Sequence, residues 1–76
     1  MNKDRRALLK KANDFLDMAL SYVSDALDQE QDCLDNMPES LEYSDKHEKM
    51  ECAVDNLNDA IDNINEAIEH IDNASE

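Results

Sequence analysis

The chain has 76 residues and a formal net charge of −13 at pH 7, with no glycine, one proline and only three aromatic residues. A chain this short holds one domain over residues 1–76 and buries too little surface to be comfortably stable alone, so we expect it to oligomerise. The shortage of glycine and aromatic residues excludes a sheet-rich fold. Helical periodicity in the 41% of residues that are hydrophobic argues against a wholly disordered chain, so we predict an all-α fold.

Hydrophobic residues recur every three or four positions over residues 3–35, which predicts a first long helix. Its central stripe consists of Leu8, Ala12, Phe15, Ala19, Tyr22, Ala26 and Cys33. Larger aliphatic residues flank this stripe on both edges, with Leu9, Leu16 and Val23 on one and Leu20, Leu27 and Leu34 on the other. The apolar face is therefore wide, and we expect it to contact more than one neighbouring helix, with Cys33 as a small core residue.

A bend is expected over residues 36–43, because Pro38 cannot continue the first helix. Ser44 is the predicted N-cap of a second helix over residues 45–74, whose first turn contains Asp45 and Glu48. Three consecutive heptads follow, each with the same spacing of apolar and acidic residues. The seam of this helix steps by four and three residues along Met50, Val54, Leu57, Ile61, Ile64, Ile68 and Ile71.

Two such helices joined by this bend form an antiparallel hairpin. Alanine recurs every seventh residue beside the second seam, at Ala53, Ala60, Ala67 and Ala74. A lone hairpin would leave the outer edges of both stripes in water, so we expect two copies to pair into a homodimeric four-helix bundle. Cys33 and Cys52 are not placed to pair within a hairpin, and we expect both to be reduced thiols.

Charge is divided unevenly along the chain. Residues 1–11 contain five of the 7 basic residues and one acid, and carry a net charge of +4; the other 65 residues carry 19 acids against two lysines, or −17. The five basic residues are Lys3, Arg5, Arg6, Lys10 and Lys11. In the hairpin they would lie beside the acids Glu66, Glu69, Asp72 and Glu76, so we expect solvated ion pairs there. A nucleic-acid arm is disfavoured, because the surrounding field repels phosphates.

Acidic residues form rows on the polar sides of both helices. The row on the second helix is Asp55, Asp59, Asp62, Glu66 and Glu69, and the row on the first includes Asp14, Asp17, Asp25, Asp28, Asp32 and Asp35. Each row carries one carboxylate per ~5 Å, so the four rows of a dimer come within a factor of two of the charge density of B-DNA. The rows either keep the surface soluble or bind a basic partner, and a halophilic source would also explain them. The scarcity of lysine after residue 11 favours a partner, because a merely soluble helix interleaves lysine with glutamate.

Catalysis is not expected, since the sequence has no glycine-rich phosphate loop and no Cys/His pair that a hairpin would bring together. We expect no cofactor or metal either: the acidic rows lack the spacing of a calcium loop, and Glu66 and His70 lie on the outer side. Glu30 is the one acid within the apolar face of the first helix, and Lys49 or His47 is expected to neutralise it across the bend. No segment has the pattern of a signal peptide or a membrane span, so we expect a cytoplasmic protein with no membrane partner.

The stretch over residues 36–55 reads NMPESLEYSDKHEKMECAVD and leads into the Ala/Ile heptads. It resembles small acidic helical proteins encoded by phages and mobile elements of Firmicutes. The distinctive part is the Pro-Glu-Ser-Leu bend, with Ser44 and the pair Met50-Glu51 behind it. The resemblance implies a helical hairpin and a mobile-element setting, in which inhibitors of host defence such as anti-CRISPR proteins occur. It carries over no functional residues.

Our leading hypothesis is a non-enzymatic, homodimeric interaction protein. Its acidic rows would occupy a basic, nucleic-acid-binding surface of a target such as a nuclease, with no direct contact to nucleic acid, and its affinity would fall steeply with salt. The alternative is a structural or assembly module that binds a partner through its apolar helix faces, with binding that survives high salt. A small-ligand sponge with a pocket between protomers is a third alternative, which the negative field and the few aromatic residues disfavour.

Overall fold

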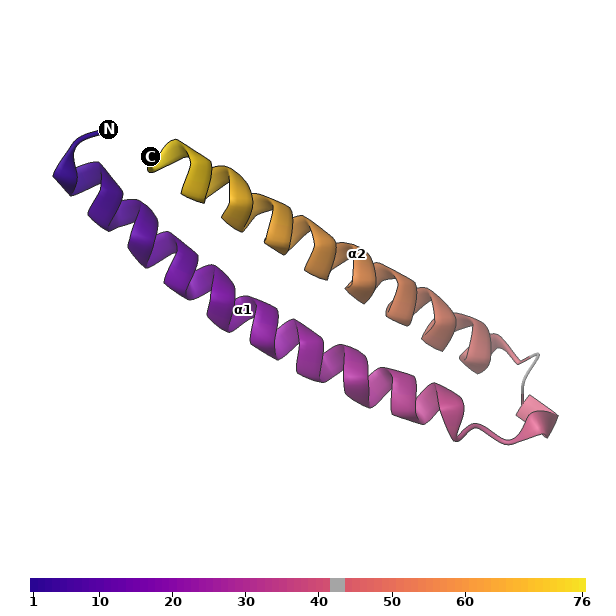
Figure 1. Ribbon diagram of the computed structural model, residues 1–76. Helices are drawn as coiled ribbons and strands as arrows, with labels where there is room; N and C mark the ends of the chain where they lie inside the picture. The colour runs from indigo at the N-terminus through magenta and orange to yellow at the C-terminus, as the bar shows by residue number, and fades with distance from the viewer. Residues whose placement is uncertain (42–43) are drawn as a thin grey trace.

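The computed structural model describes residues 1–41 and 44–76 and is a hairpin of two long helices (Figure 1). Helix α1 spans Lys3–Asp35, a short 3-10 helix η1 spans Glu39–Leu41, and α2 spans Asp45–Ala74. The two helices run antiparallel and bring both chain termini to the same end (Figure 1). The predicted all-α hairpin is therefore confirmed. The predicted bend over residues 36–43 includes residues 42 and 43, which lie outside the described residues.

Side chains at the helix ends explain where each helix starts and stops. The side-chain oxygen of Asn2 accepts the backbone N–H of Arg5 at 2.9 Å, which caps α1. The predicted N-cap of α2 is confirmed, because Ser44 Oγ accepts a hydrogen bond from the backbone N–H of His47 at 3.2 Å. The same hydroxyl donates to the carbonyl of Leu41 at 2.6 Å, so η1 is tied to the start of α2.

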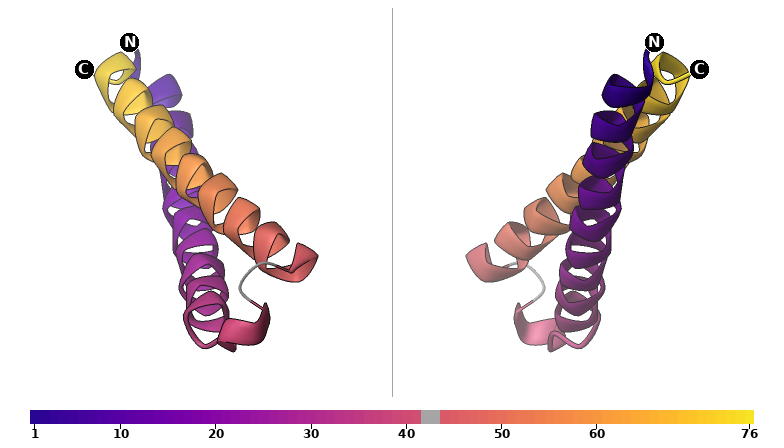
Figure 2. Two further views of the ribbon diagram at one scale, coloured as in Figure 1. Left: turned by 90° about the vertical axis from the view of Figure 1, so that its right-hand side faces the viewer. Right: turned by 90° about the vertical axis from the view of Figure 1, so that its left-hand side faces the viewer.

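The hairpin is a thin rod. Its principal extents are 59 × 15 × 13 Å and its radius of gyration is 17.3 Å, whereas a compact domain of this length has a radius of gyration of about 11 Å. The two helices cross at an angle and diverge toward the bend (Figure 2). In the part of the chain that the structure describes, neither helix is apolar enough over a sufficient length to cross a membrane.

One heptad stripe from each helix forms the contact between them. The α2 stripe is the predicted one: Val54 is buried at 7% exposure, and the other six members are half-buried. The α1 stripe, here called the leucine stripe, has six half-buried aliphatic members: Leu9, Leu16, Leu20, Val23, Leu27 and Leu34. Among the described residues Val54 is the only one classed as buried, so a single hairpin encloses almost no core.

The predicted central stripe of the first helix does not face α2. Phe15 and Tyr22 are 61% and 72% exposed, Ala26 and Cys33 are exposed as well, and Ala19 is half-buried. The reason is that α1 carries two stripes offset by one residue, or about 100° of rotation, and α2 can cover only one. The leucine stripe presents branched aliphatic side chains that bury more apolar area against the isoleucines of α2. Phe15, Tyr22, Ala26 and Cys33 therefore take no part in the contact within the hairpin, and their predicted packing against a further helix stays a prediction.

Candidate interaction faces

Two polar residues, Asn13 and Glu30, occupy positions of the leucine stripe and continue its steps of three and four. The Asn13 amide Nδ2 donates to Asp72 Oδ1 at 2.8 Å across the hairpin. The Asn13 Oδ1 atom is enclosed and has no hydrogen-bond partner. Among the described residues, this is the one hydrogen bond between side chains of α1 and α2, and it joins the helices near the termini. Asp72 marks one side of the hairpin.

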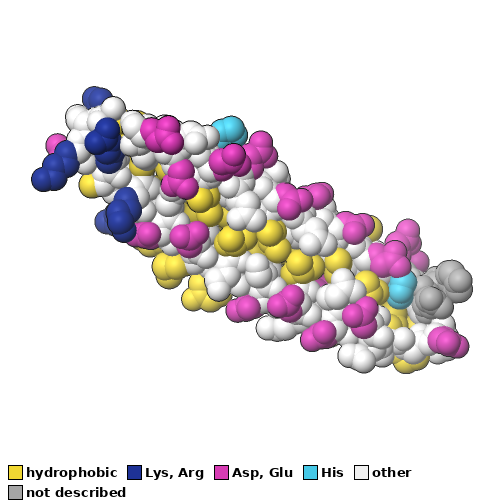
Figure 3. Space-filling model, viewed as in Figure 1, with side chains coloured by type: hydrophobic (Ala, Val, Ile, Leu, Met, Phe, Trp, Pro, Cys, Tyr) yellow, Lys and Arg dark blue, Asp and Glu magenta, His cyan; other side chains and the backbone are white. Residues whose placement is uncertain are grey.

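Carboxylates of both helices gather on the side of Asp72. We call this the acidic face, and it consists of Asp14, Asp28 and Asp35 on α1 and Glu48, Asp55, Asp62 and Glu69 on α2. Members of each row are seven residues apart, or fourteen where Ser21 interrupts the α1 row. Each row is rotated from its own seam in the same sense, so antiparallel pairing brings both rows to one side. All seven residues are exposed. Figure 3 views a side of the rod on which carboxylates flank the hydrophobic seam, with basic side chains gathered at the end of the termini.

The other acids of the predicted rows are also exposed. Asp17 lies beside the seam on the side of the acidic face, at the position of α1 that corresponds to Asp72 on α2. The remaining four lie on the outer sides of the helices: Asp25 and Asp32 on α1 and Asp59 and Glu66 on α2. Within the described residues one ion pair forms, between Lys10 and Asp14 at 3.5 Å. Two histidines also contact a carboxylate four positions away on the same helix, His47 with Glu51 at 3.0 Å and His70 with Glu66 at 3.7 Å. Most carboxylates on these surfaces therefore face water without a compensating cation.

The predicted ion pairs between the basic segment and the end of α2 do not form. Over residues 1–41 and 44–76, no ion pair joins Lys3, Arg5, Arg6 or Lys11 to a carboxylate of the hairpin. Asp72 accepts the amide of Asn13 instead. The segment is thus a cluster of solvated positive charge at one end of a negative rod.

The uncovered stripe of α1 and the alanine row of α2 share the side opposite the acidic face. We call this the apolar face, and it consists of Leu8, Ala12, Phe15, Ala19, Tyr22, Ala26 and Cys33 on α1 and Ala53, Ala60 and Ala67 on α2. Both rows are rotated from their seams in the sense opposite to the acidic rows. Leu8, Phe15 and Tyr22 are 66%, 61% and 72% exposed. The hairpin thus has one acidic and one apolar face.

A hollow of about 420 Å³ lies at the bend, between the end of α1, η1 and the start of α2. Its apolar lining includes Met37, Leu41 and Met50, and Glu30 and Lys46 contribute the charged groups. The predicted partners of Glu30 are wrong, because His47 pairs with Glu51 and no described ion pair joins Glu30 to Lys49. Glu30 is instead half-buried at the edge of this hollow.

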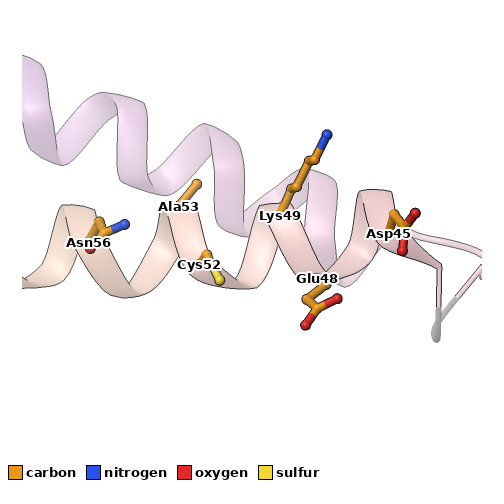
Figure 4. Close-up of a pocket in the computed structure, with 6 residues that line it drawn as sticks. All are labelled: Asp45, Glu48, Lys49, Cys52, Ala53 and Asn56. Atoms are coloured by element: carbon orange, nitrogen blue, oxygen red, sulfur yellow. The ribbon is translucent and has the colours of Figure 1, made fainter.

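A second depression is lined by α2 alone, through Asp45, Glu48, Lys49, Cys52, Ala53 and Asn56 (Figure 4). Their side chains diverge from the helix, with Lys49 and Glu48 pointing to different sides, so no set of polar atoms converges on a ligand (Figure 4). Within the described part of the chain, no three His, Cys, Asp or Glu side chains gather closely enough to hold a metal ion.

The sequence analysis did not distinguish the α1 stripe that contacts α2 from the α1 stripe that belongs to the apolar face. The signal was present, because residues 9, 13, 16, 20, 23, 27, 30 and 34 step by four and three without a break once Asn13 and Glu30 are accepted as members. Comparisons with protein-family models, with curated proteins and with solved structures found no match. No match therefore indicates a function, and the two faces are the main observations that bear on it.

Proposed function

We propose that the protein is a non-enzymatic binding protein whose acidic face occupies a basic protein surface that otherwise binds nucleic acid. The observation that supports this most is the acidic face, where carboxylates of two helices line one side of a rod 59 Å long. Lysine and arginine that contact phosphates are spread along an extended surface. A straight, rigid row of carboxylates is therefore a suitable competitor for them.

The many carboxylates without a compensating cation favour a binding role for the acidic surface. Self-repulsion of exposed like charges lowers the stability of a folded chain. Helix surfaces that need only solubility gain from lysines placed four residues from each acid. Here one lysine–carboxylate pair forms in the described part of the chain, and histidines make the two other contacts to carboxylates. The mobile-element resemblance makes a host-defence nuclease the proposed target, with inhibition by competition for its nucleic-acid site.

The test compares two full-length variants that lose the same amount of charge. The first replaces three residues of the acidic face, Asp55→Asn, Asp62→Asn and Glu69→Gln. The matched control replaces three acids near the ends of the rod and at the bend, Asp4→Asn, Glu39→Gln and Glu76→Gln. Each chain is immobilised, proteins are captured from a bacterial lysate at low salt, and the captured protein is then bound to a labelled DNA duplex.

We expect the natural chain and the control to capture the target and to release the duplex from it. The face variant should lose both activities, and raising NaCl to about 0.5 M should abolish capture by every chain, since exposed charges are then screened beyond a few ångströms. Capture that is indifferent to the face variant and to salt would refute the proposal. Salt-resistant capture that fails on Phe15→Ser would instead support an assembly module that binds through the apolar face.

A further inference from the structure

We propose that the apolar face is a homodimer interface in which α1 of one copy packs antiparallel on α1 of the other. In this arrangement Leu8, Phe15 and Tyr22 are seated on the partner's Cys33, the partner's Ala26 and the partner's Ala19. This inference is independent of the proposed target, because the acidic face lies on the opposite side of the hairpin and stays in water.

The exposed area of one hairpin supports a second copy. The chain exposes 5862 Å², whereas a folded monomer of 8.7 kDa is expected to expose about 4,700 Å². The excess of about 1,100 Å² is close to the roughly 800 Å² that each partner contributes to a stable interface. With Val54 the one buried residue among those described, a second hairpin would supply most of the missing core.

Side-chain sizes on the α1 stripe are self-complementary. Small residues occupy one set of heptad positions, Ala12, Ala19, Ala26 and Cys33, and larger residues occupy the other, Leu8, Phe15, Tyr22 and Gln29. Antiparallel helices pair one set with the other in each layer, so every layer joins a large side chain to a small one. A twofold axis between Leu20 and Ser21 uses the whole stripe. It pairs Leu8 with Cys33, Ala12 with Gln29, Phe15 with Ala26 and Ala19 with Tyr22.

Charge complementarity selects the same register. The basic segment of one copy then lies beside the end of the partner's α1, where Asp32 flanks the apolar stripe and the last turn has no basic residue. At the edge of the stripe, Lys11 lies opposite the partner's Asp32, and the pair occurs twice by symmetry. The cluster of positive charge that makes no contact with α2 thus gains acidic neighbours.

The alanine row of α2 completes the interface. Ala53, Ala60 and Ala67 continue the apolar face beyond the seam, so the α2 helices of the two copies can approach closely. The hairpin that carries this face is 59 Å long and 15 Å wide, and its dimer is a four-helix bundle with acids on its outer surfaces.

The register is tested by disulfide trapping in a Cys52→Ser background, so that Cys33 is the only natural thiol. Leu8→Cys places the introduced thiol opposite the partner's Cys33. Phe15→Cys places it seven residues out of register, about 10 Å along the helix, which exceeds the reach of a disulfide. Neither introduced thiol can reach Cys33 of its own chain, because both lie on the same straight helix. Each protein is oxidised with copper phenanthroline and run on a non-reducing gel.

We expect a covalent dimer from Leu8→Cys, and from Phe15→Cys only the background of random collisions. Equal yields from the two variants would overturn the register. Sedimentation equilibrium on the natural chain supplies a readout that needs no substitution, and twice the 8.7 kDa chain mass is expected across the micromolar range. A monomer at every concentration would overturn the dimer and assign the apolar face to a different protein.

Discussion

Asn13 offers a sharp test of the hairpin packing, because it is a polar residue at a position of the leucine stripe. Its Nδ2 donates to Asp72 across the hairpin at 2.8 Å, while its Oδ1 is enclosed without a partner. A polar residue at such a position specifies register at a cost in stability. Asn13→Leu removes that cost and extends the aliphatic contact between Leu9 and Leu16.

The expected gain follows from three contributions. Relief of an enclosed, unpartnered acceptor is worth about 1–3 kcal/mol, and loss of an exposed side-chain bond to Asp72 costs about 1 kcal/mol. Half-burial of a leucine adds about 1 kcal/mol. The net gain is about 1–3 kcal/mol, which raises the midpoint of thermal unfolding by about 5–25 °C in a domain of this size.

Circular dichroism melts at one fixed chain concentration measure this change, since the midpoint of a dimer depends on concentration. Asn58→Leu is the control: it makes the same chemical change at an exposed position of α2 and adds no side chain to the seam. It should shift the midpoint by far less. A midpoint that falls on Asn13→Leu would show that the bond to Asp72 outweighs the enclosed oxygen, and would refute the assignment of Asn13 to the apolar contact.

Three further outcomes are expected. Ser44→Ala should lower the free energy of unfolding by about 1 kcal/mol in urea titrations, because it removes the cap on α2. Ser44→Thr keeps a hydroxyl at this position and should retain most of that stability, and equal stabilities of the two variants would contradict the capping role. Lys11→Glu and Asp32→Lys should each weaken the dimer in sedimentation experiments, and the double variant should restore it; a double variant weaker than both would place these residues apart. Added NaCl should raise the melting midpoint, since it screens repulsion at a net charge of −13, and a steady fall would mean that ion pairs outweigh repulsion.

The helices and the Ser44 cap were predictable because each depends on residues near one another in the chain. Pro38 ends one periodic pattern and Ser44 begins the next, and the α2 seam has only one stripe of large aliphatic residues. The exposure of the acidic rows follows from the same local periodicity. These features need no knowledge of what lies across the hairpin.

The partner of each α1 stripe was not predictable from local pattern alone. Phe15 and Leu16 belong to adjacent stripes of similar hydrophobicity, and only packing against α2 decides between them. The basic segment posed the same difficulty. Antiparallel pairing of the helices places the acids near the end of α2 beside this segment, yet long exposed side chains gain little free energy from forming ion pairs there. Such contacts depend on the competition between neighbours, which one helix cannot reveal.

The central claim is that the apolar face is covered in solution while the outer surface stays free, and the two native thiols measure it directly. Cys33 lies on the apolar face and Cys52 on the outer side of α2, and both are free and exposed in a single hairpin. The measurement is the rate of maleimide addition to Cys33 in Cys52→Ser and to Cys52 in Cys33→Ser, at several chain concentrations. We predict that Cys52 reacts rapidly at all concentrations, whereas Cys33 is protected at high concentration and becomes reactive on dilution. Equal rates for both thiols at every concentration would contradict the claim.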